Sequence, residues 1–258
     1  MYLAKSIAAS GIRNQQYRID QIASNVANAN TVGYKNARID FKDSLYTYGL
    51  NPSRPRTPEG NQQKGHGLML NAVTRDFKPG VLQRTERPLD FSIEGEGFFS
   101  LSDASGDLVY TRNGSFHLSV ENGTTFLVNG EGLYVLDQNG ERITIPAEVT
   151  TIGVAADGTL EFRMGDNIVG GAQMGIFTFR NLKGLSSEGG GNFAATDASG
   201  ERLAATGTTV RQGVLEGSNV NLATEMTLLI RTQRAFQLSS RALSTADEME
   251  GIANNMRR

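Results

Sequence analysis

Few residues in this 258-residue chain have the type and spacing that catalysis needs. The 2 histidines, His66 and His117, lie far apart and in no motif that pairs a histidine with a nucleophile or a metal ligand. The sequence contains no cysteine, which excludes thiol nucleophiles, disulfides and cysteine-bound metals. Because catalytic residues act in constellations, we expect both histidines to be structural.

Carboxylate pairs are the second kind of chemistry to consider. Glu94 and Glu96 alternate along an expected strand and therefore share one face, which would suit a glycosidase only if a cleft lay beside them. Asp40 and Asp43 follow the first expected helix, and the chain has no tryptophan to stack on a sugar ring. Solvated surface charges explain these carboxylates more simply, so an enzyme is the alternative interpretation and not the favoured one.

Glycine-rich motifs and motifs rich in oxygen ligands also give no evidence for a cofactor or metal site. GEGFFS places Gly95 and Gly97 in the spacing that begins a dinucleotide fingerprint, but it lies in a β-type run and opens no helix. DASGD and DQNGE lack the alternating ligands and the closing glutamate of a calcium loop. We expect Gly95 and Gly97 to serve backbone geometry, and we predict no catalytic, cofactor-binding or metal-binding residue.

Composition restricts the partners. A formal net charge of -2 and a pI near 5.8 provide no basic field for nucleic acid or an anionic membrane. No apolar run reaches membrane-spanning length, and MYLAKSIAASGIRNQQYRID lacks the apolar core and the small-residue cleavage site of a secretory signal. We therefore expect no nucleic-acid partner, no membrane insertion and no cleaved signal peptide.

Two helices are predicted at the ends of the chain. Residues 2–28 contain no proline and carry apolar side chains at spacings of three, four and seven, which predicts an amphipathic helix. Its apolar stripe comprises Ala8, Ile12, Ile19, Ile22 and Val26. A second helix follows Asn219 or Asn221 as N-cap and carries Glu225 in its first turns, where a carboxylate suits the helix dipole. Its seven-residue repeat, typical of a coiled coil, comprises Leu229, Phe236 and Leu243. Further residues continue at alternating spacings of four and three: Ala242, Ala246, Met249, Ala253 and Met256.

Between the two helices the sequence is typical of β-structure. Runs such as DFSIEGEGFFSLS, LVYTRNGSFHLSV and MGIFTFR are alternating or aromatic, and turn sequences such as RNG, ENG and ADG separate them. GLNPSRPRTPEGNQQKGHG and SSEGGGNFAATDASG are expected to be loops, the first long enough to be an arm. The predicted fold class is α+β, with a β-rich central domain inserted between N- and C-terminal amphipathic helices that form a coiled coil.

These regimes set the expected domain boundaries. Residues 1–45 form the N-terminal helix and exit turn, 46–75 a linker or brace arm, 76–215 the β-rich outer domain, and 216–258 the C-terminal helix. A hairpin of two helices with narrow apolar seams leaves apolar side chains in water unless other copies cover them. The pattern therefore indicates an assembly subunit.

The stretch SNVANANTVGYK ends the first helix in uncharged amides. A subunit buried among copies of itself needs neutral groups there, and asparagines can satisfy the backbone groups that a helix end frees. Glycine then supplies a turn conformation that few other residues adopt. The predicted assembly interface comprises Ile12, Ile19, Ile22, Val26, Asn25, Asn28, Asn30, Gly33, Leu229, Phe236, Leu243 and Met249.

Three motifs, in this order, resemble the bacterial flagellar basal-body rod and hook family. They are SNVANANTVGYKNARIDF near the start, GVLQRTERPLDFSIEGEGFF with YTRNGSF in the middle, and GVLEGSNVNLATEMTLLIRTQRAFQLSSRALSTADEM near the end. The match covers both termini and the first half of the β-rich domain. The chain length and the ending are most similar to the distal rod type, with the proximal rod type next.

The resemblance implies a structural subunit without enzymatic activity or cofactor. Many copies would stack helically into a hollow drive shaft between motor and hook, with the terminal helices lining the channel and the β domain outside them. It implies three partners: copies of the chain itself, neighbouring rod and hook proteins, and the flagellar type III export apparatus. Export by that apparatus needs no cleaved signal, and it would place the protein in the basal body, outside the cytoplasmic membrane.

The segment from Leu50 to Gly67 is longer than in the shortest members of this family. Pro52, Pro55 and Pro58 restrict the backbone, which favours a brace between neighbouring subunits over a flexible tether. An exposed loop is the alternative for this segment. For the whole chain, a secreted β-domain enzyme and a coiled-coil adaptor remain the functions of other classes.

Overall fold

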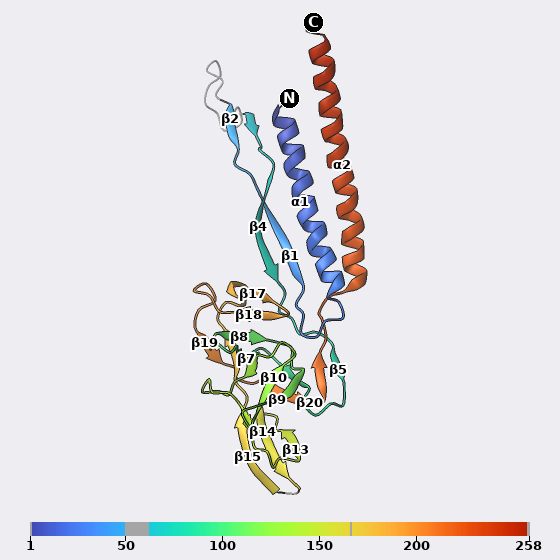
Figure 1. The fold of residues 1–258 in the computed structure, drawn as a ribbon. Helices are drawn as coiled ribbons and strands as arrows, with labels where there is room; N and C mark the ends of the chain where they lie inside the picture. Colours follow the sequence, from blue (N-terminus) through green and yellow to red (C-terminus); the bar gives the residue numbers. More distant parts are fainter. Residues whose placement is uncertain (1, 50–61, 166, 257–258) are drawn as a thin grey trace. The chain divides into compact units, whose positions relative to one another are not determined.

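The computed structural model describes residues 2–49, 62–165 and 167–256 (Figure 1). The chain divides into two compact units. Unit 1 contains the residues up to Ala27, Ala37–Arg75 and those from Asn221 on, and unit 2 contains Asn28–Asn36 and Asp76–Val220. The expected outer domain, residues 76–215, thus lies within unit 2, which also takes up residues 28–36.

Unit 1 is built on two long helices. Helix α1 spans Tyr2–Ala27 and helix α2 spans Leu222–Asn255, which confirms the helices expected at both ends of the chain. They lie side by side, and the two chain termini lie at the same end of the pair, so the helices are antiparallel (Figure 1). The side chain of Asn221 accepts a hydrogen bond from the Thr224 amide at 3.0 Å, so Asn221 is the N-cap of α2.

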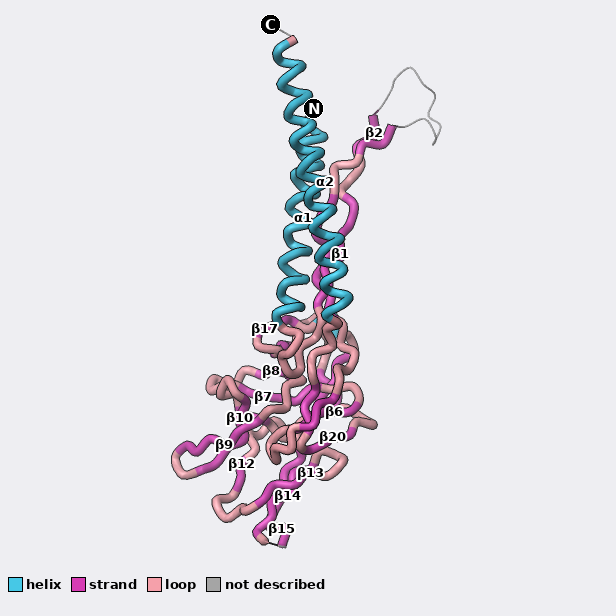
Figure 2. Tube along the Cα trace, turned by 90° about the vertical axis from the view of Figure 1, so that its right-hand side faces the viewer, coloured by secondary structure: helices cyan, strands magenta, loops and turns pink. Residues whose placement is uncertain are grey.

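A narrow β ribbon completes unit 1. Strand β1, Ala37–Asp43, pairs antiparallel with β4, Leu68–Arg75, and the ribbon runs along α1 (Figure 2). Strand β2, Thr47–Gly49, pairs with β3, Gln62–Lys64. The expectation of a loop was therefore wrong for Gln62–Lys64, since pairing with β2 makes a strand of a polar run without alternation. The brace prediction for Pro52, Pro55 and Pro58 lies outside the described residues.

Unit 2 is β-rich, as expected. Its largest sheet has the strand order β12-β10-β11-β7-β8-β18-β17, with β16 and β19 joined through β7 and with β9 beside β10. The members are β7 Phe98–Ser102, β8 Leu108–Thr111, β9 Phe116–Glu121, β10 Thr124–Asn129, β11 Tyr134–Val135, β12 Thr144–Ile145, β16 Ile176–Phe179, β17 Ser186–Gly189, β18 Asn192–Ala194 and β19 Arg202–Ala204.

Three smaller sheets complete unit 2. One has the order β13-β14-β15, and the other two are the pairs β20–β6 and β21–β5. Their members are β5 Leu82–Arg84, β6 Phe91–Glu94, β13 Thr151–Val154, β14 Thr159–Met164, β15 Asn167–Gln173, β20 Thr209–Gln212 and β21 Val214–Glu216. A short 3-10 helix, η1, spans Leu182–Gly184.

Two apolar clusters form the core of unit 2. The larger gathers side chains such as Phe91, Leu101 and Leu160, and the smaller contains Phe98 and Phe193, which pack ring edge to ring face. Phe193 is fully buried although it lies in the stretch SSEGGGNFAATDASG, which was expected to be a loop. That expectation was wrong, because β17 and β18 form a hairpin whose turn is made by the glycine run, and the buried ring anchors it.

Candidate assembly surfaces

The two helices of unit 1 approach closely along small side chains. A Cβ atom on Gly11 of α1 would lie 3.5 Å from the hydroxyl of Ser239 on α2. A shallow pocket beside this contact is lined by Ala4, Ile7, Ala8, Ser10, Gly11, Gly67, Leu68, Ser239 and Ala242. Small residues at the contact let the two helix backbones approach each other. Larger apolar side chains on either side of the contact therefore remain partly exposed to water.

The seam residues predicted from the sequence are only partly buried within one chain. Ile22 is buried, whereas Ile12, Ile19, Val26, Leu229, Phe236 and Leu243 are half-buried and Met249 is exposed. A helix pair alone covers one side of each seam, as expected for narrow apolar stripes.

A group of ion pairs joins the first turns of α1 to the last turns of α2. The Lys5 ammonium contacts the Asp247 carboxylate at 2.6 Å and also the Glu250 carboxylate. Hydrogen bonds to Asp247 and then Glu250 raise the pKa of Lys5 above the ordinary lysine value. The three side chains are 29%, 57% and 25% exposed, so solvent screens the ion pairs in part, and the group favours the antiparallel register more than it stabilises the helix pair.

Asn25 joins three elements of unit 1. Its buried side-chain amide donates to the Ala37 carbonyl at 2.9 Å and accepts from the Ala37 amide at 3.2 Å. The same amide nitrogen donates to the buried Glu225 carboxylate at 3.2 Å. The end of α1, the start of β1 and the first turn of α2 are therefore held by one neutral group that both donates and accepts. Glu225 lies in the first turn of α2, as expected, but it is buried.

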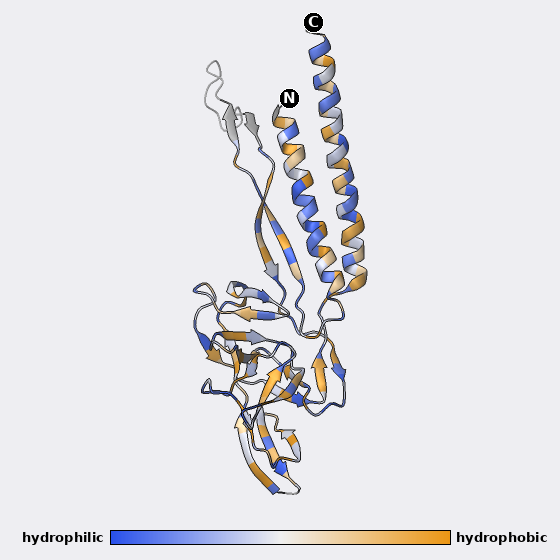
Figure 3. Ribbon diagram, in the orientation of Figure 1, coloured by the Kyte–Doolittle hydropathy of each residue, from blue (hydrophilic) through white to orange (hydrophobic). Residues whose placement is uncertain are grey.

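A second apolar face on α2 is exposed. Met226, Ile230, Leu238, Met249 and Ile252 are each 50% to 66% exposed, and we call this set the outer stripe. At about 100° per residue these positions fall within an arc of about 140°, on a different side of the helix from the seven-residue repeat. Hydrophobic residues recur along the whole of α2 in Figure 3. Sequence reasoning named Met249 but missed the other four members of the outer stripe. The spacings of four and eight from Met226 through Ile230 to Leu238 carry their signal.

The amides after Asn25 have separate roles in unit 2. Asn28 closes a turn, because its side-chain oxygen and its carbonyl accept from the Thr31 hydroxyl and amide, each at 3.1 Å. Asn30 is exposed. Gly33 has φ of +69°, and its amide donates to the Glu216 carbonyl at 2.7 Å. The turn role expected for Gly33 is therefore confirmed.

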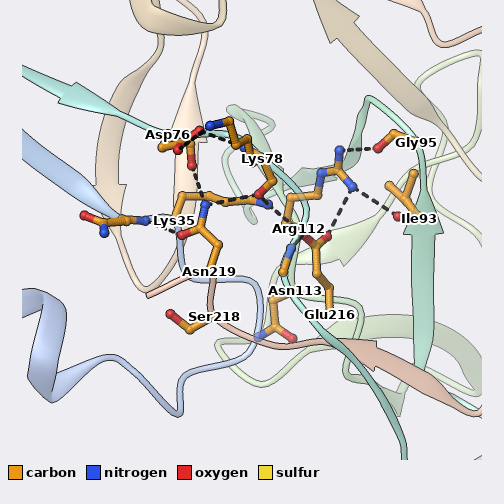
Figure 4. Close-up of polar contacts among 12 residues, drawn as sticks. Lys35, Asp76, Lys78, Ile93, Gly95, Arg112, Asn113, Glu216, Ser218 and Asn219 are labelled. Carbon is orange, nitrogen blue, oxygen red and sulfur yellow. Dashed lines mark hydrogen bonds and ion pairs between the residues drawn. The ribbon is translucent and has the colours of Figure 1, made fainter. Parts of the chain in front are cut away.

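A fully buried ion cluster of unit 2 was not anticipated from the sequence. The Glu216 carboxylate accepts from the Lys35 ammonium at 2.6 Å and from the Arg112 guanidinium at 3.1 Å (Figure 4). All three side chains are at most 4% exposed. Burial lowers the pKa of Lys35 below the ordinary lysine value, and the attraction of Glu216 offsets this only in part. Lys35 and Glu216 are 181 positions apart, so no local pattern pairs them.

The candidate chemical residues do not gather in space. His117 faces the Arg87 guanidinium at 3.4 Å, and Glu94 contacts Arg211 at 2.8 Å on the surface. Gly95 and Gly97 have positive φ, which confirms that they serve backbone geometry. Within the described part of the chain, no three His, Asp or Glu side chains are grouped so that they could hold a metal ion. No helix among the described residues is long and apolar enough to cross a bilayer.

Family models match both ends and the middle of the chain. Residues 6–35 match the model described as flagella basal body rod protein. Residues 92–162 match the flagellar hook protein FlgE/F/G D1 domain. Residues 211–256 match the flagellar basal body rod FlgEFG protein C-terminal model.

Curated relatives match nearly the whole chain. The flagellar basal-body rod protein FlgG of Borreliella burgdorferi is 37% identical, with 97% of each chain covered. FlgG of Bacillus subtilis is 36% identical over 96% of this chain and 97% of its own length. The flagellar hook-basal body complex protein FlhP of Bacillus subtilis is 32% identical over 99% of this chain and all of its own length.

Proposed function

Because this chain belongs to the flagellar basal-body rod family, in which it is a structural subunit most like the distal rod protein, we propose that its copies stack helically into a hollow shaft carrying motor torque to the hook. In this proposal the helices of unit 1 form the inner wall and unit 2 lies outside them. The chain has no catalytic role and needs no cofactor.

The outer stripe of α2 carries this proposal. Covering its five members would be favourable by roughly 25 cal/mol for each Å² of apolar area removed from water, and within the described part of one chain they stay at least half exposed. A second copy that brings its own helix pair supplies an apolar face of the same kind. Half-buried seam residues such as Ile12 and Phe236 lie on another side of the helix pair and become buried by further copies in this proposal.

Further partners follow from membership of this family. We propose contacts with neighbouring rod and hook proteins at the two ends of the stack. We also propose that the type III export apparatus delivers the chain without a cleaved signal to the basal body, outside the cytoplasmic membrane. Residues 46–75 brace neighbouring copies in this proposal.

Substitution of the outer stripe tests the proposal. Leu238→Asp replaces a side chain that is 66% exposed in the single chain, so folding should be unaffected. In the stack the carboxylate would be buried without a partner, at a cost of several kcal/mol for every subunit. We expect folded protein by circular dichroism, no rods by electron microscopy of isolated basal bodies, and no swimming by a strain that carries only this variant.

Ser240→Asp is the matched control, since it adds the same charge at an exposed position of α2 about 40° outside the arc of the outer stripe. It should still build rods. Export is checked by the amount of each variant outside the cytoplasmic membrane. Normal rods from Leu238→Asp would contradict the proposal.

A further inference from the structure

The buried ion cluster of Lys35, Arg112 and Glu216 contains two positive side chains and one negative side chain. Both cations contact the Glu216 carboxylate, and all three side chains are almost completely withdrawn from water. Asp76 acts on Lys35 and Glu96 on Arg112 only as further, weaker charges. A buried ion pair adds little net stability when it forms. Removing one partner is costly, because the remaining charge is then buried without a partner. Glu216 is therefore the group on which both cations depend.

The remaining bonds of the cluster go to backbone groups of distant segments. Lys35 also donates to the Lys78 carbonyl at 2.8 Å, and the Glu216 carboxylate accepts from the Gly80 amide at 2.8 Å. Arg112 donates to the Ile93 and Gly95 carbonyls at 3.2 and 2.6 Å (Figure 4). The cluster thus connects residues 28–36 and 76–80 to the end of β21.

Asn219 makes a second connection among the same segments. Its side-chain oxygen accepts from the Asn36 amide at 2.7 Å, and its nitrogen donates to the Asp76 and Lys78 carbonyls at 2.7 and 3.1 Å. The Gly33 amide donates to the Glu216 carbonyl at 2.7 Å. Polar contacts of the segment 216–219 therefore hold residues 28–36.

The apolar cores of unit 2 contribute little to holding residues 28–36. The two buried clusters and the side chains packed against them draw on residues from Phe77 to Val210, and none lies in 28–36, although Tyr34 of that segment is buried outside these clusters. A segment held by polar contacts and not by the shared core can detach while the core stays folded.

We propose that Glu216 is a lock on a local closing step of unit 2. In the closed state residues 28–36 lie against β21 and the 76–80 segment. In the open state they are released, Lys35 returns to water, and the sheet core remains intact. The Glu216 carboxylate sets the ratio of the two states. In the closed state it holds residues 28–36 and 76–80, which adjoin the points where the chain enters and leaves unit 2.

Hydrogen exchange on the full-length chain tests this proposal. In Glu216→Gln both cations lose their carboxylate, so the closed state should be disfavoured by the cost of a broken buried pair. Exchange of the Gly33 and Gly80 amides should quicken by roughly 100- to 1000-fold. The amides of Ser100 and Leu136, which donate within the sheet at 2.9 Å each, should keep their protection.

Two further variants separate the lock from other causes. Glu94→Gln removes an equal charge from an exposed pair of unit 2 and should leave all four amides unchanged. Lys35→Met/Glu216→Gln has one buried cation fewer than Glu216→Gln, so it should recover part of the protection at Gly80. It also covers the case in which the single variant does not fold.

Three results would overturn the proposal. Equal loss of protection at Ser100 and Gly33 would make the cluster part of one global core. Unchanged exchange at Gly80 in Glu216→Gln would show that the carboxylate holds nothing closed. A double variant no better protected than Glu216→Gln would show that charge balance is not the cause.

Discussion

At the scale of single residues, Gly33 is restricted in two ways. Its φ of +69° lies in the left-handed region, and a Cβ atom would stand 2.6 Å from the Asn113 backbone nitrogen. We expect Gly33→Ala to lower the free energy of unfolding of unit 2 by about 2–4 kcal/mol, because strain and a backbone clash add. Denaturant titration of the full chain measures this loss.

Gly123→Ala is the control for the conformational part alone. Gly123 has φ of +83°, but a Cβ atom there would meet nothing within 4 Å. Its substitution should cost only about 1 kcal/mol, as for one left-handed residue. Similar losses for the two variants would contradict the close contact of Gly33 with Asn113.

Lys35 predicts a pH dependence of stability. Burial lowers its pKa in the folded chain, so on raising the pH the folded state loses this proton before the unfolded state does. Up to a pH of about 10.4, the lysine pKa in the unfolded chain, the unfolded state binds more protons at this residue than the folded state does. The contribution of Lys35 to stability therefore rises with pH in this range. The free energy of unfolding of wild type relative to Lys35→Met should therefore increase as the pH is raised toward about 10.4.

Lys78→Met serves as the reference for that measurement, since the Lys78 side chain is 82% exposed. Wild type relative to this variant should show no such increase. A difference between wild type and Lys35→Met that does not change with pH would contradict the lowered pKa.

At the scale of elements, Phe236 and Leu238 distinguish the two apolar faces of α2. Phe236 belongs to the seven-residue repeat and is half-buried, whereas Leu238 lies on the outer stripe and is exposed. Phe236→Asp should weaken the helix pair within one chain and also abolish rod assembly, at a cost of roughly 3–5 kcal/mol for the lost ring and more for the buried charge.

Two readouts measure the Phe236→Asp variant. Thermal unfolding should show an unchanged transition for unit 2, because its core contains no residue of α2. Strains carrying the variant should not swim, while export of the subunit should be normal. Normal assembly would remove Phe236 from the interface, and loss of the whole fold would favour a monomer core around this helix.

At the scale of the whole molecule, the division into units predicts which fragment folds best. A fragment of residues 46–218 keeps the linker and the β-rich domain but lacks Lys35, Asn36 and Asn219. A fragment of residues 28–220 keeps every member of the buried ion cluster and Asn219. We expect 28–220 to be the more stable by about 2–4 kcal/mol.

Denaturant unfolding of the two fragments, followed by a β-sheet signal, measures this difference. The fragment 28–220 with Lys35→Met and Asn36→Pro serves as an internal control, because it removes the two contacts without shortening the chain. It should approach 46–218 in stability. Equal midpoints for 28–220 and 46–218 would mean that unit 2 does not depend on residues 28–36.

Local patterns in the sequence predicted the elements whose cause is local. The spacing of Ile12, Ile19 and Ile22 indicates α1, the repeat around Phe236 indicates α2, and Asn221 marks its start. Alternation with turn glycines predicted most strands of unit 2. The family followed from motifs that are contiguous in the chain.

Contacts between distant residues were decided only by the tertiary structure. Asn25 pairs with Ala37 and Glu225, and Glu216 gathers Lys35 and Arg112 across most of the chain. A hydrogen-bond partner depends on where the backbone brings each group, and spacing along the chain does not encode this for residues 181 positions apart. For the same reason SSEGGGNFAATDASG resembled a loop, since the burial of Phe193 that makes it a hairpin comes from strands elsewhere in the sheet.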